Sequence, residues 1–370
     1  MRAKLLALAA GVAVAALPVA AHAQAKVTVY GLAHVSIDMM DADSATAADN
    51  GSRTSVSSNV SRLGIKAAAD LGGGLKGIAQ YEMTVATDGE GQATSVSTTT
   101  TVSGVTGATA TSTSTATSSR LLGNAMNSFV GLEGGFGTIL AGIHDTPLKT
   151  LGRQVEFFPE YIGDARNLTE QDLRPNNAIV YLSPIFSGAS ARLAYYADED
   201  ASKTQDGYSA SVMYSGGPIL AGGAYESWKN PSSYYKTLYR LVAQYKAGPV
   251  RVGGQYQQGS GKANVSGVDR SVWGLGASYS IGKAVLKGQY YSADDKGGTA
   301  SSGATMYALG ADYNLGSQTT VYLAYAKTDN DTNGAFTVNG SGAQGAHGDG
   351  ITPKAGTSPS GFSIGMIQKF

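Results

Sequence analysis

Several residue types that carry chemistry are scarce in this chain. Its 370 residues include no cysteine, two tryptophans and four histidines, so a disulfide framework, a thiolate metal site and a thiol nucleophile are excluded. Lysine plus arginine and aspartate plus glutamate both total 27, a balance that gives no indication of a nucleic-acid partner. Beyond residue 21, no apolar run approaches the ~20 residues that a membrane-spanning helix needs. If this protein lies in a membrane, it must cross it as strands.

Residues 1–23 are predicted to be a secretory signal peptide. Arg2 and Lys4 precede an apolar run that ends at Ala21, and Ala21-His22-Ala23 has the small-x-small pattern of a cleavage site. Cleavage after Ala23 would leave residues 24–370 as a single domain. Removing Arg2 and Lys4 from the 27 basic residues leaves 25 against 27 acidic ones, a net charge of −2.

The abundant residues favour strands and tight turns. The chain has 50 glycines and 21 tyrosines, and its glycine content is nearly twice the average of about 7%. The end of the chain alternates with a period of two, which marks a strand with a different solvent on each side. One face of this last strand carries Phe362, Ile364, Met366, Gln368 and Phe370. A strand that stops at a terminal aromatic residue is typical of the aromatic girdle of an outer-membrane barrel.

Short turns and long loops alternate along the whole chain. Seven tight glycine or proline turns are predicted near residues 71–74, 134–137, 184–188, 216–218, 248–249, 282–283 and 315–316. Between them lie eight longer segments, at about 40–57, 86–122, 146–176, 198–206, 228–235, 258–269, 292–303 and 329–359. Fifteen connections imply sixteen strands, an even number, with short turns on one side of a membrane and long loops on the other. We therefore predict an all-β fold, a 16-stranded antiparallel transmembrane β-barrel around a water-filled channel.

Two of the long loops have unusual compositions. Residues 94–119 are mostly serine and threonine, which bury little apolar surface, and we expect a flexible or shallowly paired segment that is a solvated loop or a latch onto a neighbouring subunit. The third loop, residues 147–176, combines rings at Phe157, Phe158 and Tyr161 with many charges. We expect it to fold into the lumen, with the rings on the inner wall; an outward loop at a subunit interface is the alternative. Its candidate constriction residues are Arg153, Glu156, Glu160, Asp164 and Arg166.

A set of basic residues is predicted on the wall opposite this loop. Where one parity of a strand is apolar and faces lipid, the other parity faces the lumen. This rule places five basic side chains inside the barrel: Arg62, Lys66, Arg192, Arg240 and Arg251. Opposed to Glu156, Glu160 and Asp164, they predict a transverse field and a weak anion preference. Pairing of each arginine with a neighbouring carboxylate, for example Glu82 or Glu133, is the alternative.

Four blocks of sequence resemble the Gram-negative general porins, in the branch typical of β-proteobacteria. Residues 61–76, 129–138, 177–184 and 364–370 are similar, in order, to the hairpins and closing strand of that family. The resemblance implies a homotrimeric diffusion channel with the third loop in the pore. It also implies contact with outer-membrane lipid and lipopolysaccharide, and reading of Phe370 by the barrel-insertion machinery. Val180 and Leu182 stand where family members often carry an arginine and an acid.

The function predicted from these observations is passive diffusion of ions and small hydrophilic solutes across a bacterial outer membrane. A structural anchor or adhesin, and a barrel hydrolase, are the alternatives. The hydrolase is disfavoured because His144 and Asp145, if adjacent on a strand, would point to opposite faces. His347 and Asp349 lack the spacing of metal ligands. We therefore predict no catalytic residue, no metal and no cofactor.

Overall fold

The computed structural model describes residues 25–43, 52–88, 94–103, 109–118, 122–199, 206–339 and 350–370. The predicted signal peptide lies outside the described residues. The strands are β1 Lys26–Asp41, β2 Arg53–Ser58, β3 Arg62–Gly72, β4 Leu75–Val85, β5 Thr94–Ser103, β6 Thr109–Ser118, β7 Leu122–Ala125, β8 Ser128–Gly134, β9 Gly137–Ile143, β10 Ala178–Leu182, β11 Ala189–Tyr196, β12 Gly207–Gly216, β13 Ile219–Trp228, β14 Thr237–Ala247, β15 Val250–Ser260, β16 Arg270–Ile281, β17 Ala284–Ala293, β18 Ala304–Asn314, β19 Thr319–Asn330 and β20 Ser360–Lys369. The short helices are α2 Pro147–Gly152, α3 Arg166–Thr169 and the 3₁₀ turn Lys262–Asn264.

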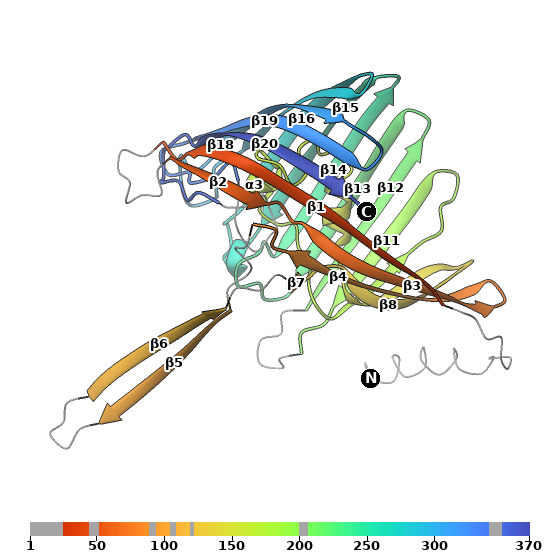
Figure 1. Ribbon diagram of the computed structural model, residues 1–370, viewed down its shortest axis with the longest axis horizontal. Helices are drawn as coiled ribbons and strands as arrows, with labels where there is room; N and C mark the ends of the chain where they lie inside the picture. Colours follow the sequence, from red (N-terminus) through yellow and green to blue (C-terminus); the bar gives the residue numbers. More distant parts are fainter. Residues whose placement is uncertain are drawn as a thin grey trace.

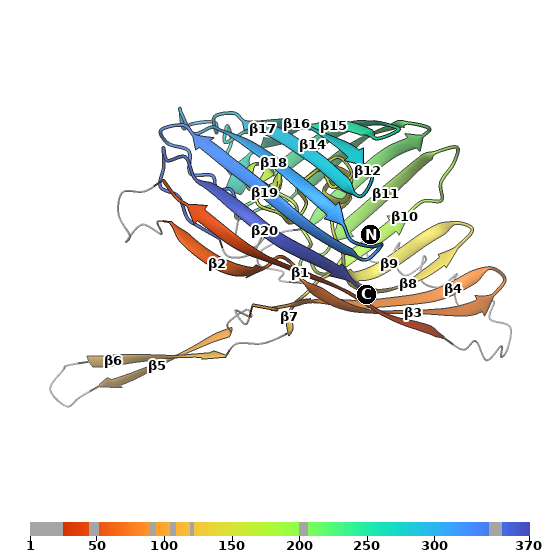
Figure 2. The same ribbon diagram turned by 45° about the horizontal axis from the view of Figure 1, so that its top comes forward.

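One antiparallel sheet closes into a barrel, with β1 as the strand at which it joins (Figures 1 and 2). One edge of β1 pairs with β20, and its other edge pairs with β3 and then with β2. In the same way β7 and β8 follow one another along β4. Strands β2 and β3 together form one interrupted stave, meaning one strand position of the barrel, and β7 and β8 form another. The 18 strands of the sheet therefore make a barrel of sixteen staves. The prediction of a 16-stranded antiparallel barrel is confirmed.

The connections follow the predicted alternation with two differences. All seven tight turns occur where the sequence placed them, between β3 and β4, β8 and β9, β10 and β11, β12 and β13, β14 and β15, β16 and β17, and β18 and β19. The first long loop is shorter than predicted, because β2 begins at Arg53 and pairs with residues 35–40 of β1. The serine- and threonine-rich stretch forms the hairpin β5–β6, a separate two-stranded sheet that extends away from the barrel (Figure 1).

Alternation along each strand separates an apolar outer face from a mixed inner face. In β1, Val29 and Ile37 are 60% and 50% exposed, whereas His34 and Asp38, on the opposite parity, are buried. In β20, Ile364 is exposed and Ser363 is buried. The outer faces of β11 to β19 likewise expose leucine, valine, tyrosine and tryptophan. Such a band is the surface that a barrel presents to lipid.

Within the described ranges, no helix has the length and apolar character needed to cross a membrane.

Candidate functional site

The segment that joins β9 to β10, residues 144–177, packs against the inner face of the barrel wall. It begins with α2, which has Pro147 in its first turn and Thr146 as its N-cap; the Thr146 side chain accepts a hydrogen bond of 3.1 Å from the backbone N–H of Lys149. Buried Leu148 and Leu151 form a cluster with inward-facing apolar residues of β13 and β14, which are Leu220, Ala224, Leu238 and Val242. This cluster fixes the start of the segment against one part of the wall.

The aromatic part of the segment packs against strands further round the barrel. Phe157 lies directly over Gly276 of β16, where an added Cβ would come within 2.3 Å of the ring. Phe158 and Tyr161 are buried with Ala308 of β18 and with residues of β19. The wall is flat at these points because it carries glycine and alanine, so the rings fit against it. Phe157, Phe158 and Tyr161 thus contact residues of β16, β18 and β19.

Lys287, a wall residue on β17, contacts both the aromatic part of the segment and an acidic residue of the neighbouring strand β18. Its Nζ lies 3.6 Å from the centroid of the Tyr161 ring and 2.9 Å from Oδ2 of Asp312. Neither Lys287 nor Asp312 was predicted from the sequence to belong to the site. Leu286 and Leu309 point outward on the same two strands, so the parity rule that found Arg251 would also have placed Lys287 and Asp312 inside.

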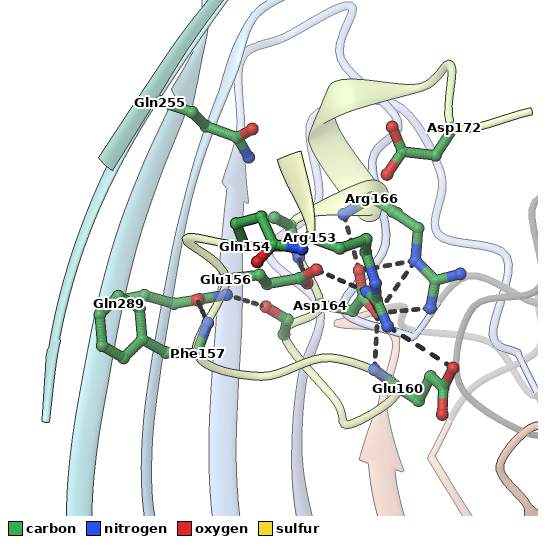
Figure 3. Close-up of polar contacts among 12 residues, drawn as sticks. Arg153, Gln154, Glu156, Phe157, Glu160, Asp164, Arg166, Asp172, Gln255 and Gln289 are labelled. Atoms are coloured by element: carbon green, nitrogen blue, oxygen red, sulfur yellow. Dashed lines mark hydrogen bonds and ion pairs between the residues drawn. The ribbon is translucent and has the colours of Figure 1, made fainter. Parts of the chain in front are cut away.

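A compact ionic cluster holds the middle of the segment together (Figure 3). Arg153 contacts three carboxylates, those of Glu156 at 2.5 Å, Asp164 at 3.2 Å and Glu160 at 3.5 Å. Arg166 pairs with Asp164 at 2.6 Å. The carboxylate of Asp164 also accepts the backbone N–H of Glu160 at 2.7 Å, and that of Glu156 accepts the backbone N–H of Ala165 at 2.8 Å. Charge-assisted bonds of this kind set the loop conformation.

Burial and the arginines act in opposite directions on these carboxyl groups. Burial alone would raise the pKa of Glu160, but Arg62 and Arg153 hold this pKa below its ordinary value. The same competition lowers the pKa of Asp164, where Arg166 and Arg153 outweigh burial. Burial dominates at Glu156 and raises its pKa, and the nearby Asp164 adds to the shift. Glu160 and Asp164 are therefore the carboxylates that keep their charge as the pH falls.

The end of the segment is fixed by a buried ion pair. Nη1 of Arg240, on β14, lies 2.7 Å from Oδ1 of Asp172, and the side chains are 1% and 3% exposed. The same guanidinium donates to Oε1 of Gln257 at 2.6 Å. Nearby, Glu170 pairs with Lys262 at 2.7 Å and Arg270 at 3.0 Å. These contacts connect the segment to β14, β16 and the loop after β15.

Replacing Asp172 by alanine should destabilise the folded protein, because it leaves the Arg240 charge buried and unpaired. Loss of one partner of a buried ion pair costs about 3–5 kcal/mol. The temperature at which the detergent-solubilised protein loses its β-sheet circular dichroism signal should fall clearly. Lys76→Ala is the matched control, because its pair with Glu133 is exposed, at 52% and 44%, and should matter little. Equal midpoints for the two variants would contradict this reading of the Asp172 pair.

The five basic wall residues take different positions. Arg62 pairs with Glu160 at 3.2 Å and so connects β3 to the loop. Lys66 remains exposed, with its Nζ 4.4 Å from the centroid of the Tyr30 ring. Arg192 lies beside Gln154 and Thr150 of the loop and has no ion-pair partner among the described residues. The remaining two hold the loop itself: Arg240 through Asp172, and Arg251 through the carbonyl oxygens of Gln154 at 2.9 Å and Glu156 at 3.2 Å.

This arrangement differs from the expected opposition of three acids and five bases. Glu156 and Asp164 are almost fully buried and paired with Arg153 and Arg166 of their own loop, and only Glu160 reaches a basic residue of the wall. Arg240 points inward but is covered by α2 and the end of the loop. Glu82 and Glu133, suggested as alternative partners of the wall arginines, contact other residues. Glu82 accepts a hydrogen bond of 2.8 Å from the Tyr30 hydroxyl, and Glu133 pairs with Lys76.

His144 and Asp145 also differ from their expected placement. Both follow the end of β9, and Nδ1 of His144 lies 2.7 Å from the backbone oxygen of Asp145. The Asp145 carboxylate is occupied by Lys149 and Arg174, each at 2.8 Å. Burial lowers the pKa of His144. No group of three or more metal-ligating side chains occurs among the residues described.

A family model described as "Gram-negative porin" matches residues 7–333. The major outer membrane protein P.IB of Neisseria gonorrhoeae is 28% identical over 217 residues, 56% of this chain and 53% of the relative. P.IB of Neisseria meningitidis serogroup B is 29% identical over 220 residues, 57% of this chain and 56% of the relative. The chain thus spans about half the length of the curated relatives it matches.

Solved structures show the same fold. An anion-selective porin from Comamonas acidovorans superposes with a TM-score of 0.74 and 24% identity, covering 94% of this chain and 100% of that chain. Outer-membrane expressed OmpT of Vibrio cholerae superposes with a TM-score of 0.66 and 16% identity, covering 95% and 99%. At these identities the superpositions establish the barrel architecture alone.

Proposed function

Because the chain belongs to the Gram-negative porin family, we propose that it forms a water-filled channel in the bacterial outer membrane through which ions and small hydrophilic solutes diffuse passively. The observation that carries the proposal is a closed barrel of sixteen staves with an apolar outer face and charged groups inside. Barrels of this size leave an aqueous channel rather than a packed core. The family membership favours a channel over the barrel hydrolase and the structural anchor.

The loop of residues 147–176 is the proposed constriction of this channel. It contacts both sides of the interior, since Arg62 of β3 reaches Glu160 while Phe157 rests on β16 and α2 on β13 and β14. The barrel opening at this level is therefore divided by the loop. Internal ion pairs make the loop rigid enough to set a size limit for solutes.

We propose that the constriction favours anions. The most deeply buried acids of the loop, Glu156 and Asp164, are neutralised by Arg153 and Arg166. Four basic side chains remain partly or fully exposed on the wall, namely Arg62, Lys66, Arg192 and Arg251, against Glu160. Side chains at a narrow, partly desolvated zone act on ions more strongly than charges further than ~8 Å away, which salt screens.

Liposomes that contain the purified protein should swell in isotonic solutions of small sugars. The swelling rate should fall as the molar mass of the sugar rises, because the loop limits the opening. Light scattering after rapid mixing measures the rate, and protein-free liposomes are the control. Liposomes in which the protein is inserted and folded but which do not swell would contradict the channel function.

A homotrimer is the proposed assembly. The outer parity of β1, β3 and β4 carries small residues, at Ala33, Ala67, Gly77 and Ala79, which suit close contact between barrels better than contact with lipid. One solved structure of Vibrio cholerae OmpT, 16% identical with a TM-score of 0.64, is described as a trimer form. We further propose, from the family membership, contact with outer-membrane lipid and lipopolysaccharide and assembly by the barrel-insertion machinery.

Unheated protein extracted in mild detergent should migrate at three times the monomer mass on a gel and convert to the monomer on boiling. Replacing Ala67 and Ala79 together by tryptophan should shift the unheated sample to monomer, because bulky rings hold the barrels apart. Leu241→Trp, on the outer face of β14 at the far side of the barrel, is the matched control. Migration of the unmodified, unheated protein only as a monomer would contradict the trimer.

A further inference from the structure

A small cavity lies where the constriction loop returns to the barrel wall. It has a volume of about 270 Å³. Its lining consists of Arg174 to Asn177 at the end of the loop, Tyr196 at the end of β11 with Ala197 and Asp198 after it, and Trp228 and Tyr234. At ~30 Å³ for each water in the liquid, it would hold about nine waters. This volume is below the usual range of drug-sized pockets and suits one six-membered ring.

The position of the cavity places it before the constriction. Tyr196 and Trp228 are the last residues of β11 and β13, at the ends that carry the long loops. Their side chains have the inward parity, because the alternate residues Tyr195 and Tyr225 are exposed on the outer face. A solute that enters from the long-loop side would therefore meet this cavity before the ionic cluster around Arg153.

The chemistry of the lining combines rings with uncharged hydrogen-bonding groups. The Trp228 ring stacks on Tyr196 with centroids 5.4 Å apart and contacts Tyr234 at 5.8 Å. Its position is fixed, because its Nε1 donates to Glu226 at 2.8 Å. Exposed Asn176 and Asn177 offer amides that both donate and accept. Rings with adjacent amides and a carboxylate suit a ligand that has apolar C–H faces and a rim of hydroxyls.

The charges around the cavity argue against an ionic ligand. Arg174 is paired with Asp145 at 2.8 Å, so its charge is already compensated. Asp198 contributes a carboxylate to the lining, which would repel an anion. Among the described residues that line the cavity, Arg174 is the only cation and Asp198 the only acid.

One buried group in the lining lacks a partner. The hydroxyl of Tyr196 has no hydrogen-bond partner among the described residues, and the residue is only 2% exposed. A buried hydroxyl without a partner is unfavourable. Because the hydroxyl oxygen has almost no accessible surface, a ligand in the cavity does not reach it, and Tyr196 contributes its ring rather than its hydroxyl to the lining.

From these observations we propose that the cavity is a binding site for a neutral monosaccharide in its ring form, held against the aromatic residues and hydrogen-bonded by Asn176, Asn177 and Asp198. As a step in transport, this inference rests on the proposed channel function. Binding itself does not require conduction and is tested separately. The affinity should be weak, because a channel site must release its solute.

Tryptophan fluorescence measures the binding directly, since the chain has only two tryptophans. In a Trp273→Phe background, which removes the outward-facing ring, Trp228 is the only tryptophan, and excitation at the red edge of its absorption avoids the tyrosines. Titration of the detergent-purified protein with D-glucose should give a saturable change with half-saturation near ~1 mM or above. Mannitol, an open-chain polyol, should give less than about one tenth of the response at equal concentration.

Variants separate ligand contacts from structural roles. Asn176→Ala with Asp198→Ala should raise the half-saturation concentration more than about tenfold. Tyr196→Phe should leave both the titration and the thermal stability unchanged, because the deleted hydroxyl has no partner in the described chain and almost no accessible surface. Ser232→Ala, an exposed loop change outside the cavity lining, should leave the titration unchanged.

Two results would overturn the proposal: no saturable fluorescence change in folded protein, or equal binding by the double variant and the parent. If liposomes swell but fluorescence does not respond, the channel stands and the sugar site fails. If fluorescence responds but liposomes do not swell, the site stands and the channel function fails.

Discussion

Deletion of Phe370 should abolish accumulation of the folded barrel in the outer membrane. Its backbone N–H and carbonyl exchange hydrogen bonds of 3.1 and 3.0 Å with Gly31, beyond the last pair of the β1–β20 ladder. Its ring covers Gly31 and is 59% exposed on the outer face. The deletion thus removes the end of the seam that closes the barrel, an aromatic anchor of the girdle, and the residue that we propose the insertion machinery reads.

The measurement is the amount of heat-modifiable protein in outer-membrane fractions. Phe362→Ala, which removes an outward ring from the same strand, is the matched control and should reduce the amount much less. Refolding into detergent separates the two causes of the defect. A deletion variant that refolds normally but fails in cells indicates lost recognition, and one that fails in both indicates the seam. Wild-type amounts of folded protein in cells would contradict the prediction.

Reversal of three wall charges should invert the ion selectivity. Arg62→Glu, Lys66→Glu and Arg192→Glu together replace positive charges that remain accessible in the lumen. A unit charge ~8 Å away contributes about 0.5 kcal/mol in water-like surroundings. The summed electrostatic contribution of three reversals therefore exceeds 1.4 kcal/mol, even after partial screening. That energy corresponds to a tenfold change in the permeability ratio.

The zero-current potential in a salt gradient should change sign in this variant. Lys327→Glu is the control, because Lys327 has the outward parity of β19, beside exposed Leu323. It should leave the potential close to that of the parent. Arg62→Ala with Lys66→Ala should shift the potential in the same direction by a smaller amount. An unchanged potential in the triple variant would show that these residues do not line the constriction.

Most of the barrel could be predicted from the sequence, because two local signals repeat along it. Alternation fixes the face of each residue, and glycine turns fix the register of each hairpin. Residues 53–58 were missed as a strand, since their small polar side chains show no apolar alternation. Their strand character comes from pairing with the long strand β1, which is a contact distant in sequence.

The site was less predictable than the wall. Parity placed Arg62, Arg240 and Arg251 inside, but it does not reveal what covers an inward residue. Arg240 is buried because α2 and Asp172 lie over it, and that depends on how the loop folds. Arg153 and Asp164 are 11 residues apart and meet only through this fold. The inward positions Val180 and Leu182, where the family often has charges, join an apolar cluster with Leu173 of the loop.

Single-channel recording in a planar lipid bilayer tests the central claim most directly. Purified protein should insert in steps, and each step should add an open-channel current that is linear in voltage. A variant that lacks Phe157 to Tyr161, the part of the loop that rests on β16 and β18, should give larger steps, because the constriction is gone. Insertion of folded protein without any conductance, or steps of equal size in the two proteins, would contradict a channel narrowed by this loop.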